Sequence, residues 1–313
     1  MSRMFCEIYR NLFEITNQTC IVSLMKISIL CPTRGRPDNL MRILESIERT
    51  TYDLSSLEFL VYFDQDDATQ FLDLSRFEFV RKFVGPRMWM SNYHNFLYAN
   101  STGELIMACA DDFVFLSQRW DIAIKTFYQN QVDNYWVVFG NDLGVHAGKM
   151  PTHFFLHRDW PMALGTWVQP FRASPWDLWI FDVANDINRL RYLPEVEIQH
   201  LHYRQSKVSV LKDSTYQDIW RTQFSFRPME SYKLLYRERR ADVVILAEKI
   251  GIPTPKKGKY FLGHFVIKFL SNTSPHEQMR LYNSTNIEIF LGVFRRLTPL
   301  SRISRFGLRK KMN

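Results

Sequence analysis

The chain has too few cysteines, too widely spaced, for a disulfide-stapled protein. Its four cysteines are Cys6, Cys20, Cys31 and Cys109, and their spacing matches neither a disulfide framework nor a zinc site. Two of them lie in apolar runs typical of strands. The sequence therefore predicts buried thiols in a reducing compartment.

Long apolar runs are also missing. The stretch 260–270 is shorter than the roughly 20 residues of a membrane-spanning helix, and it contains His264 and Lys268. The first residues carry charged side chains and lack the continuous apolar core of a secretory signal. We therefore expect a cytoplasmic protein that at most lies against the inner face of a membrane.

The chain is rich in hydrophobic residues and carries a net positive charge. Of its 313 residues, 46% are hydrophobic and 15% aromatic, which is enough for one large domain or for a domain with an appendage. The formal net charge is +8 and the pI is about 9.3. This excess indicates an anionic partner, such as a nucleotide diphosphate, a nucleic acid or an acidic membrane surface.

The most informative stretch is 103–115, where an apolar run of strand length ends in Asp111 and Asp112. A run that is apolar on both faces is typical of a strand inside a sheet covered by helices, and such sheets bind ligands at their carboxyl edge. Two adjacent carboxylates repel each other unless a positive group lies between them. A divalent cation that holds a diphosphate meets that need, and a turn with two solvated aspartates is the alternative.

Two earlier strands also end in charged residues. The strand 26–31 runs into a loop with Arg34 and Arg36 and then into a helix, which is the arrangement of an anion site. The strand 57–63 is followed by Asp64, Asp66 and Asp67. We expect one of these acids to cap a helix and another to bind a base or a ribose, and the parallel pairing of the two strands follows from the helix between them.

The second half of this region contains aromatic residues and histidines. Residues 143–172 look like one long loop whose aromatic and histidine side chains suit a sugar or a base, and the alternative is that the aromatic residues pack the loop onto the core. A helix follows, with Asp177 in its first turn, and then a strand on which His200 and His202 share one face. Either histidine can be a metal ligand or a structural residue.

The order of these parts resembles the family 2-like glycosyltransferases of the GT-A fold, which belong to the nucleotide-diphospho-sugar transferases. Four segments carry the resemblance in the family's order: 27–37, 63–69, 92–112, and Trp176 and Asp177 with 192–194, His200 and His202. The resemblance implies an α/β domain with a Rossmann-like, mostly parallel sheet flanked by helices. It covers residues 26–205, between a lead-in segment 1–25 and a helical, basic C-terminal region 206–313.

The resemblance also implies a site. The donor-binding residues are Pro32, Thr33, Arg34, Arg36, Asp64, Asp66, Asn95 and Asp111. The metal ligands come from Asp111, Asp112, His200 and His202, and the metal is Mn²⁺ or Mg²⁺. Asp177 is the catalytic base, and His153 and Trp176 contact the acceptor. The implied reaction is an inverting hexosyl or pentosyl transfer from a nucleotide-diphosphate sugar, with a UDP-sugar expected, to a hydroxyl acceptor.

The chain departs from the family at two places. The metal motif reads Cys109-Ala-Asp-Asp, without the first acid of the usual triplet, and the acidic strand end reads Asp66-Asp-Ala-Thr. For that reason, either Asp64 or Asp66 can be the residue that holds the nucleotide base. The alternative function is a degenerate GT-A protein that binds a nucleotide sugar, nucleic acid or membrane without catalysis.

The acceptor has two interpretations. The basic and apolar residues 287–311 suit an anionic membrane surface, which would place the enzyme beside lipid-linked glycans. They suit a phosphate backbone equally well, which would make the acceptor a modified base in DNA. The third alternative is a charged helical appendage that packs on the domain.

Overall fold

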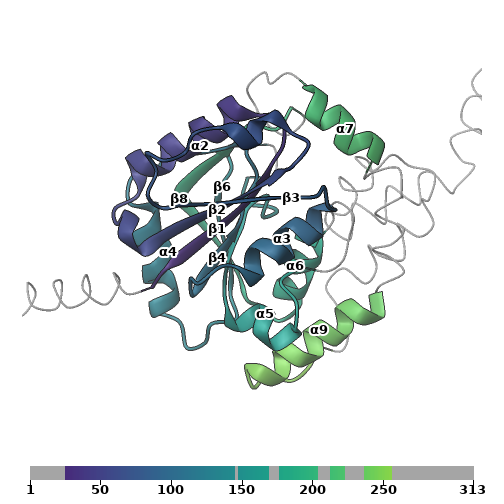
Figure 1. Ribbon diagram of the computed structural model, residues 1–313. Helices are drawn as coiled ribbons and strands as arrows, with labels where there is room; N and C mark the ends of the chain where they lie inside the picture. The colour runs from purple at the N-terminus through teal and green to yellow at the C-terminus, as the bar shows by residue number, and fades with distance from the viewer. Residues whose placement is uncertain (1–24, 145–146, 169–175, 204–211, 223–235, 256–313) are drawn as a thin grey trace, which may run out of the picture.

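The computed structural model describes residues 25–144, 147–168, 176–203, 212–222 and 236–255 (Figure 1). The expected lead-in segment 1–25 falls almost entirely outside these residues, and so does the tail 287–311. Within the described residues, no helix is both long and apolar enough to cross a membrane.

An eight-stranded sheet organises the domain, in the order β3-β2-β1-β4-β7-β6-β8-β5. The strands are β1 (Ile27–Thr33), β2 (Leu57–Asp64), β3 (Val80–Gly85), β4 (Leu105–Ala108), β5 (Phe113–Phe115), β6 (Val137–Asn141), β7 (Phe154–His157) and β8 (Leu190–His200). Strands β1 to β4 are parallel to one another, and β6 is parallel to β8, whereas β7 and β5 run antiparallel to their neighbours. The expected α/β architecture with a mostly parallel sheet is confirmed.

Helices cover both faces of the sheet (Figure 1). The helices are α2 (Pro37–Thr50), α3 (Met90–Ala99), α4 (Trp120–Gln129), α5 (Asp159–Leu164), α6 (Trp176–Asp186), α7 (Ser214–Thr222) and α9 (Tyr236–Lys249), with short 3₁₀ turns η1 (Leu54–Ser56) and η2 (Ala68–Phe71). One core cluster contains buried residues of α2 and α4, and the other contains those of α3, α5, α6 and α9. The sheet therefore lies between two apolar layers, which explains why β1 and β2 are buried along their whole length.

The segment 143–172 is not the long loop that the sequence suggests. It contains β7 and α5, and β7 is inserted between β4 and β6. A strand of four residues is too short for the sequence to show the alternation of polar and apolar residues that predicts a strand. β7 is a strand because it pairs with β4 on one side and β6 on the other. The prediction of one long loop was wrong because of β7 and α5, whereas the burial of Trp160 and Trp167 agrees with the alternative that the aromatic residues pack onto the core.

A buried carboxylate connects the strands at the end of the sheet opposite the charged loops. Glu58 on β2 accepts hydrogen bonds from the Ser28 hydroxyl at 2.6 Å, the Thr102 amide at 2.5 Å and Arg81 Nη1 at 3.0 Å. Lys26 Nζ lies 3.2 Å from the same carboxylate. These contacts link β1, β2, β3 and the turn before β4, so Glu58 fixes the relative positions of the strands whose far ends form the candidate site.

Candidate functional site

The loop after β1 is held in an unusual turn. Gly35 has a φ of +66°, a left-handed conformation that favours glycine. The Gly35 amide donates to Asp67 Oδ2 at 2.6 Å, and Asp67 also caps η2 by accepting from the Thr69 amide. Helix α2 begins directly afterwards at Pro37, with Arg36 at the cap position. Asp67 is therefore the capping acid of its group, and it also orders the loop that carries the two arginines.

Asp111 and Asp112 lie at the carboxyl edge and are both only 4% exposed. Asp111 accepts from the Thr33 hydroxyl at 2.7 Å and from Arg36 Nη1 at 2.9 Å. Asp112 accepts from the Tyr216 hydroxyl at 2.6 Å, and its Oδ2 lies 4.0 Å from Arg36 Nη1. The alternative of two solvated aspartates is wrong, and in this arrangement a buried guanidinium lies beside both carboxylates.

The two neighbouring carboxylates titrate in opposite directions. Burial and repulsion by Asp112 raise the pKa of Asp111 to about 6, against the lowering effect of Arg36 and Thr33. Burial also acts to raise the pKa of Asp112, but His200, Arg36 and Tyr216 outweigh it, so this pKa is lowered. Asp112 is therefore the carboxylate that keeps its negative charge most firmly.

One buried oxygen in this cluster lacks a donor. Asp112 Oδ1 has no hydrogen-bond partner among the described residues, and His200 Nε2 lies 3.4 Å from it. A buried carboxylate oxygen without a partner is costly, and a carboxylate with an imidazole suits Mn²⁺. These two side chains fit a divalent ion, whereas both oxygens of Asp111 already accept protein donors. No group of three or more ligating side chains occurs within the described ranges.

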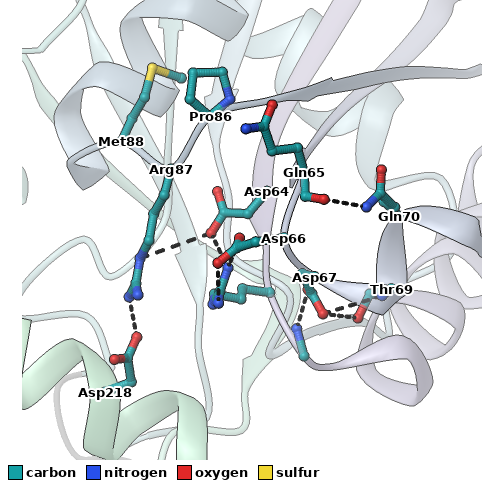
Figure 2. A network of polar contacts seen from close by, with 12 residues as sticks. Asp64, Gln65, Asp66, Asp67, Thr69, Gln70, Pro86, Arg87, Met88 and Asp218 are labelled. Carbon is teal, nitrogen blue, oxygen red and sulfur yellow. Dashed lines mark hydrogen bonds and ion pairs between the residues drawn. The ribbon is translucent and has the colours of Figure 1, made fainter.

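A second cluster lies at the end of β2, and Figure 2 shows its contacts. Asp64 is buried and accepts from the Tyr93 hydroxyl at 2.5 Å and from Arg34 Nη1 at 2.8 Å. Asp66 is exposed and forms a bidentate pair with Arg34, at 2.6 and 3.0 Å. Arg87 Nε lies 4.0 Å from Asp64 Oδ2. The exposed Asp66–Arg34 pair can face a ligand, whereas Asp64 positions Arg34.

Asp177 lies in the first turn of α6. Its Oδ1 accepts from the Leu178 amide at 2.9 Å. Burial raises the pKa of Asp177 to about 6, against the lowering effects of the backbone hydrogen bonds and of His200. Burial therefore outweighs the backbone hydrogen bonds at the start of α6, and a carboxylate with this pKa can accept a proton near neutral pH.

Three further predicted residues contact other parts of the domain. The Asn95 amide bonds at both ends to the backbone of Val168, at 3.0 and 3.1 Å. His153 is buried and accepts from the Gly140 amide, and the Trp176 ring packs 4.8 Å from that of His94. The donor role of Asn95 and the acceptor roles of His153 and Trp176 stay predictions.

Two other predicted residues lie nearer the acidic cluster. Pro32 is a buried residue of β1. The His202 ring lies 5.4 Å from that of His200 and 4.9 Å from that of Tyr216. His202 is thus beside the two side chains that contact Asp112, and its role as a ligand stays a prediction.

Four residues that contact the clusters were not predicted from the sequence. They are Arg87, Tyr93, Asp213 and Tyr216. Arg87 follows the end of β3, as the other charged residues follow β1, β2 and β4, so its position at a strand end could have indicated it. Asp213 and Tyr216 lie outside the predicted domain 26–205, and no local pattern links them to the site.

Comparisons with known proteins show the fold. No protein-family model matches the chain, and no curated protein sequence matches it. Among solved structures, residues 1–349 of S. aureus TarS in complex with UDP-GlcNAc match with a TM-score of 0.51 and 11% identity, over 70% of this chain. The match spans 66% of the TarS chain, slightly less than two thirds of its length.

A second solved structure gives the same result. The mannosyltransferase PcManGT from Pyrobaculum calidifontis, in complex with GDP-Man and Mn²⁺, matches with a TM-score of 0.50 and 13% identity. The match covers 91% of this chain and 81% of that chain. At these identities the likeness shows a shared GT-A-like fold.

Proposed function

We propose that this chain is a glycosyltransferase that moves a sugar from a nucleotide-diphosphate donor to a hydroxyl acceptor. The observation that carries the proposal is the meeting of Thr33, Arg36, Asp111, Asp112 and His200 at the carboxyl edge of the sheet. Two solved structures that share this fold are complexes with UDP-GlcNAc and with GDP-Man. Both the edge and the fold therefore support a nucleotide-sugar donor.

The nucleotide would lie between the two clusters. The Arg34–Asp66 pair offers a guanidinium and a carboxylate side by side, which can meet the acceptors and donors of a base or ribose. Arg36 is held close to the sheet edge by Asp111, where it can bind phosphate oxygens. We assign the nucleoside to the end of β2 and the diphosphate to the ends of β1 and β4.

A divalent ion fits beside Asp112 and His200, and Mn²⁺ or Mg²⁺ is proposed. Such an ion supplies positive charge against the negative charge that develops on the leaving diphosphate. The chain's own contribution is an ionised, buried carboxylate whose pKa is kept low by His200, Arg36 and Tyr216 despite its burial. The PcManGT structure contains Mn²⁺, which agrees with this choice.

Asp177 is the proposed base, and the transfer is then inverting. Its carboxylate would remove the proton from the acceptor hydroxyl while the sugar–phosphate bond breaks. The pKa of about 6, raised by burial, leaves Asp177 ionised at neutral pH and able to take up that proton. The charge of His200, which lies beside Asp112, also acts to lower the pKa of Asp177, and this supports a base close to the acidic cluster.

The experiment is a transfer and donor-hydrolysis assay on the full chain. A panel of UDP- and GDP-linked sugars is supplied with Mn²⁺ or with a chelator, and the released nucleoside diphosphate is measured. We expect release with at least one donor in Mn²⁺ and none in chelator. Asp177→Asn should lower transfer at least about a hundredfold, the usual contribution of a general base, while donor affinity stays unchanged.

Asp133→Asn is the matched control, because Asp133 forms a half-buried pair with Arg189 next to the start of β8, far along that strand from His200. This variant should keep full transfer. Undiminished turnover by Asp177→Asn would remove Asp177 from the mechanism. Donor binding without any turnover by the unaltered chain would favour the alternative of a degenerate GT-A protein.

A further inference from the structure

The proposed donor site is more negative than a diphosphate would tolerate. It contains three arginines and six aspartates, which are Arg34, Arg36, Arg87, Asp64, Asp66, Asp111, Asp112, Asp213 and Asp218. An anionic ligand that approaches this set meets net repulsion. Two of the six acids, Asp213 and Asp218, come from one segment, α7 and the residue before it.

Asp213 covers the face of Arg36 that suits a phosphate. Its two oxygens accept from Arg36 Nε at 2.8 Å and from Nη2 at 3.0 Å. This is the forked, bidentate geometry with which arginine also binds phosphate. Arg36 additionally stacks over the Tyr216 ring, 4.1 Å from its centroid. In this arrangement, a phosphate can take the fork of Arg36 only if Asp213 leaves it.

Asp218, five residues later, contacts a second arginine through one carboxylate oxygen. It pairs with Arg87 Nη2, and Arg87 in turn lies 4.0 Å from Asp64 (Figure 2). The segment is also anchored by the Thr215 hydroxyl, which donates to the Arg34 carbonyl at 3.0 Å. Helix α7 therefore contacts all three arginine-bearing positions of the site.

We propose that Asp213 covers the phosphate-binding fork of Arg36 and that Asp218 covers Arg87 beside the proposed nucleoside subsite, so that α7 is an anionic gate which a nucleoside diphosphate must displace. The inference rests on the proposed function, because it names how the same site admits its donor. Withdrawal of two carboxylates leaves three arginines against four aspartates, and a divalent ion at Asp112 then makes the site net positive. Arg87 becomes a further donor-binding residue.

The test uses isosteric variants of the full chain. Asparagine keeps the shape of aspartate and is an equally good helix N-cap, so Asp213→Asn preserves the bond to the Tyr216 amide while it removes the charge. Asp218→Asn does the same for Arg87. We expect each variant to bind UDP or GDP, and inorganic pyrophosphate, about tenfold more tightly than the unaltered chain in calorimetry, and the double variant to bind more tightly still.

Asp133→Asn is again the matched control and should leave these affinities unchanged. Equal or weaker binding by Asp213→Asn and Asp218→Asn, with a nucleoside diphosphate bound by the unaltered chain, overturns the gate but not the proposed function. Failure of the unaltered chain and of all variants to bind UDP, GDP or pyrophosphate overturns both. Binding by the double variant alone supports the gate strongly.

Hydrogen exchange gives a second readout that does not depend on a variant. The Tyr216 amide donates to the Asp213 carboxylate and the Gln217 amide to the Asp213 main-chain carbonyl, so both should be protected in the ligand-free protein. Addition of UDP or GDP with Mn²⁺ should raise their exchange rates as Asp213 leaves Arg36. Unchanged or slower exchange of these amides at saturating nucleotide contradicts displacement.

Discussion

At the scale of single residues, burial and neighbouring charge give similar carboxyl groups different chemistry. Burial raises the pKa of Asp177 to about 6. Asp112 is a buried aspartate too, but its pKa is lowered because His200, Arg36 and Tyr216 favour its charged form. A pair of acids whose pKa values are pushed apart is what a base and a cation-binding carboxylate need. The proposed roles follow from these surroundings.

The pH dependence of transfer should reflect Asp177. A base must be ionised to accept a proton, and the pKa of Asp177 is raised by burial to about 6. Turnover should therefore be full above that pH and fall tenfold per pH unit below it. The measurement is kcat at saturating donor and acceptor between pH 5 and pH 8. A flat profile across this range would argue that another group takes the proton.

At the scale of elements, the two ends of the parallel strands have different tasks. The carboxyl ends of β1, β2 and β4 carry the proposed site, whereas Glu58 near the start of β2 holds the strands in register. Burial acts to raise the pKa of Glu58, but hydrogen bonds from Ser28, Thr102, Arg81 and Lys26 outweigh it and lower the pKa to about 2. The amino end is therefore an ion-pair network that stabilises the fold.

Glu58→Gln should destabilise the protein by about 2 kcal/mol, because it removes the charge that accepts hydrogen bonds from Ser28 and Thr102 and that pairs with the partly exposed Lys26 and Arg81. Since the folded-state pKa is lowered, the stabilisation is fully present above the ordinary glutamate pKa and is lost as the pH falls toward 2. Urea unfolding at neutral and acidic pH measures both effects. Glu45→Gln, in an exposed pair with Arg76, should cost less than about 1 kcal/mol. A Glu58 variant as stable as this control would contradict the argument.

At the scale of the whole molecule, the charge is unevenly distributed along the chain. Residues 256–313 contain twelve lysines and arginines and two glutamates, a net charge of +10, so residues 1–255 carry a net charge of −2. The overall charge of +8 thus comes entirely from the last part of the chain. A nucleic acid or an acidic membrane surface is therefore expected to bind there, whereas the nucleotide diphosphate binds at the donor site.

The full chain should bind an anionic surface in a salt-dependent way, and Arg309, Lys310 and Lys311 should contribute to it. Their joint replacement by glutamine should lower the slope of log affinity against log salt by about 2 to 3 on duplex DNA, since each phosphate contact contributes about 0.9. Co-sedimentation with phosphatidylserine vesicles tests the membrane alternative in parallel. Binding to only one of the two surfaces identifies the acceptor class, and an unchanged slope shows that other residues bind the anion.

Local patterns in the sequence were sufficient for the fold and for part of the site. Apolar runs that end in charged residues predicted β1, β2 and β4, and the helix between β1 and β2 predicted their parallel pairing, which the structure confirms. Both signals depend only on residues close together in the chain. For the same reason they placed Arg36 and Asp111 at one edge, because the carboxyl ends of parallel neighbours meet there.

Only the tertiary structure decided which partners these residues have. Arg36 and Asp213 are 177 residues apart, and Tyr216 and Asp112 are 104 apart, so no periodicity or spacing connects them. Likewise, β7 became a strand only through pairing with β4 and β6. The sequence determined where charge collects, because strand ends are local features. The tertiary structure determined which carboxylates stay charged and which arginines are covered by an acid. The physical reason is that desolvation and ion pairing arise only when distant segments pack together.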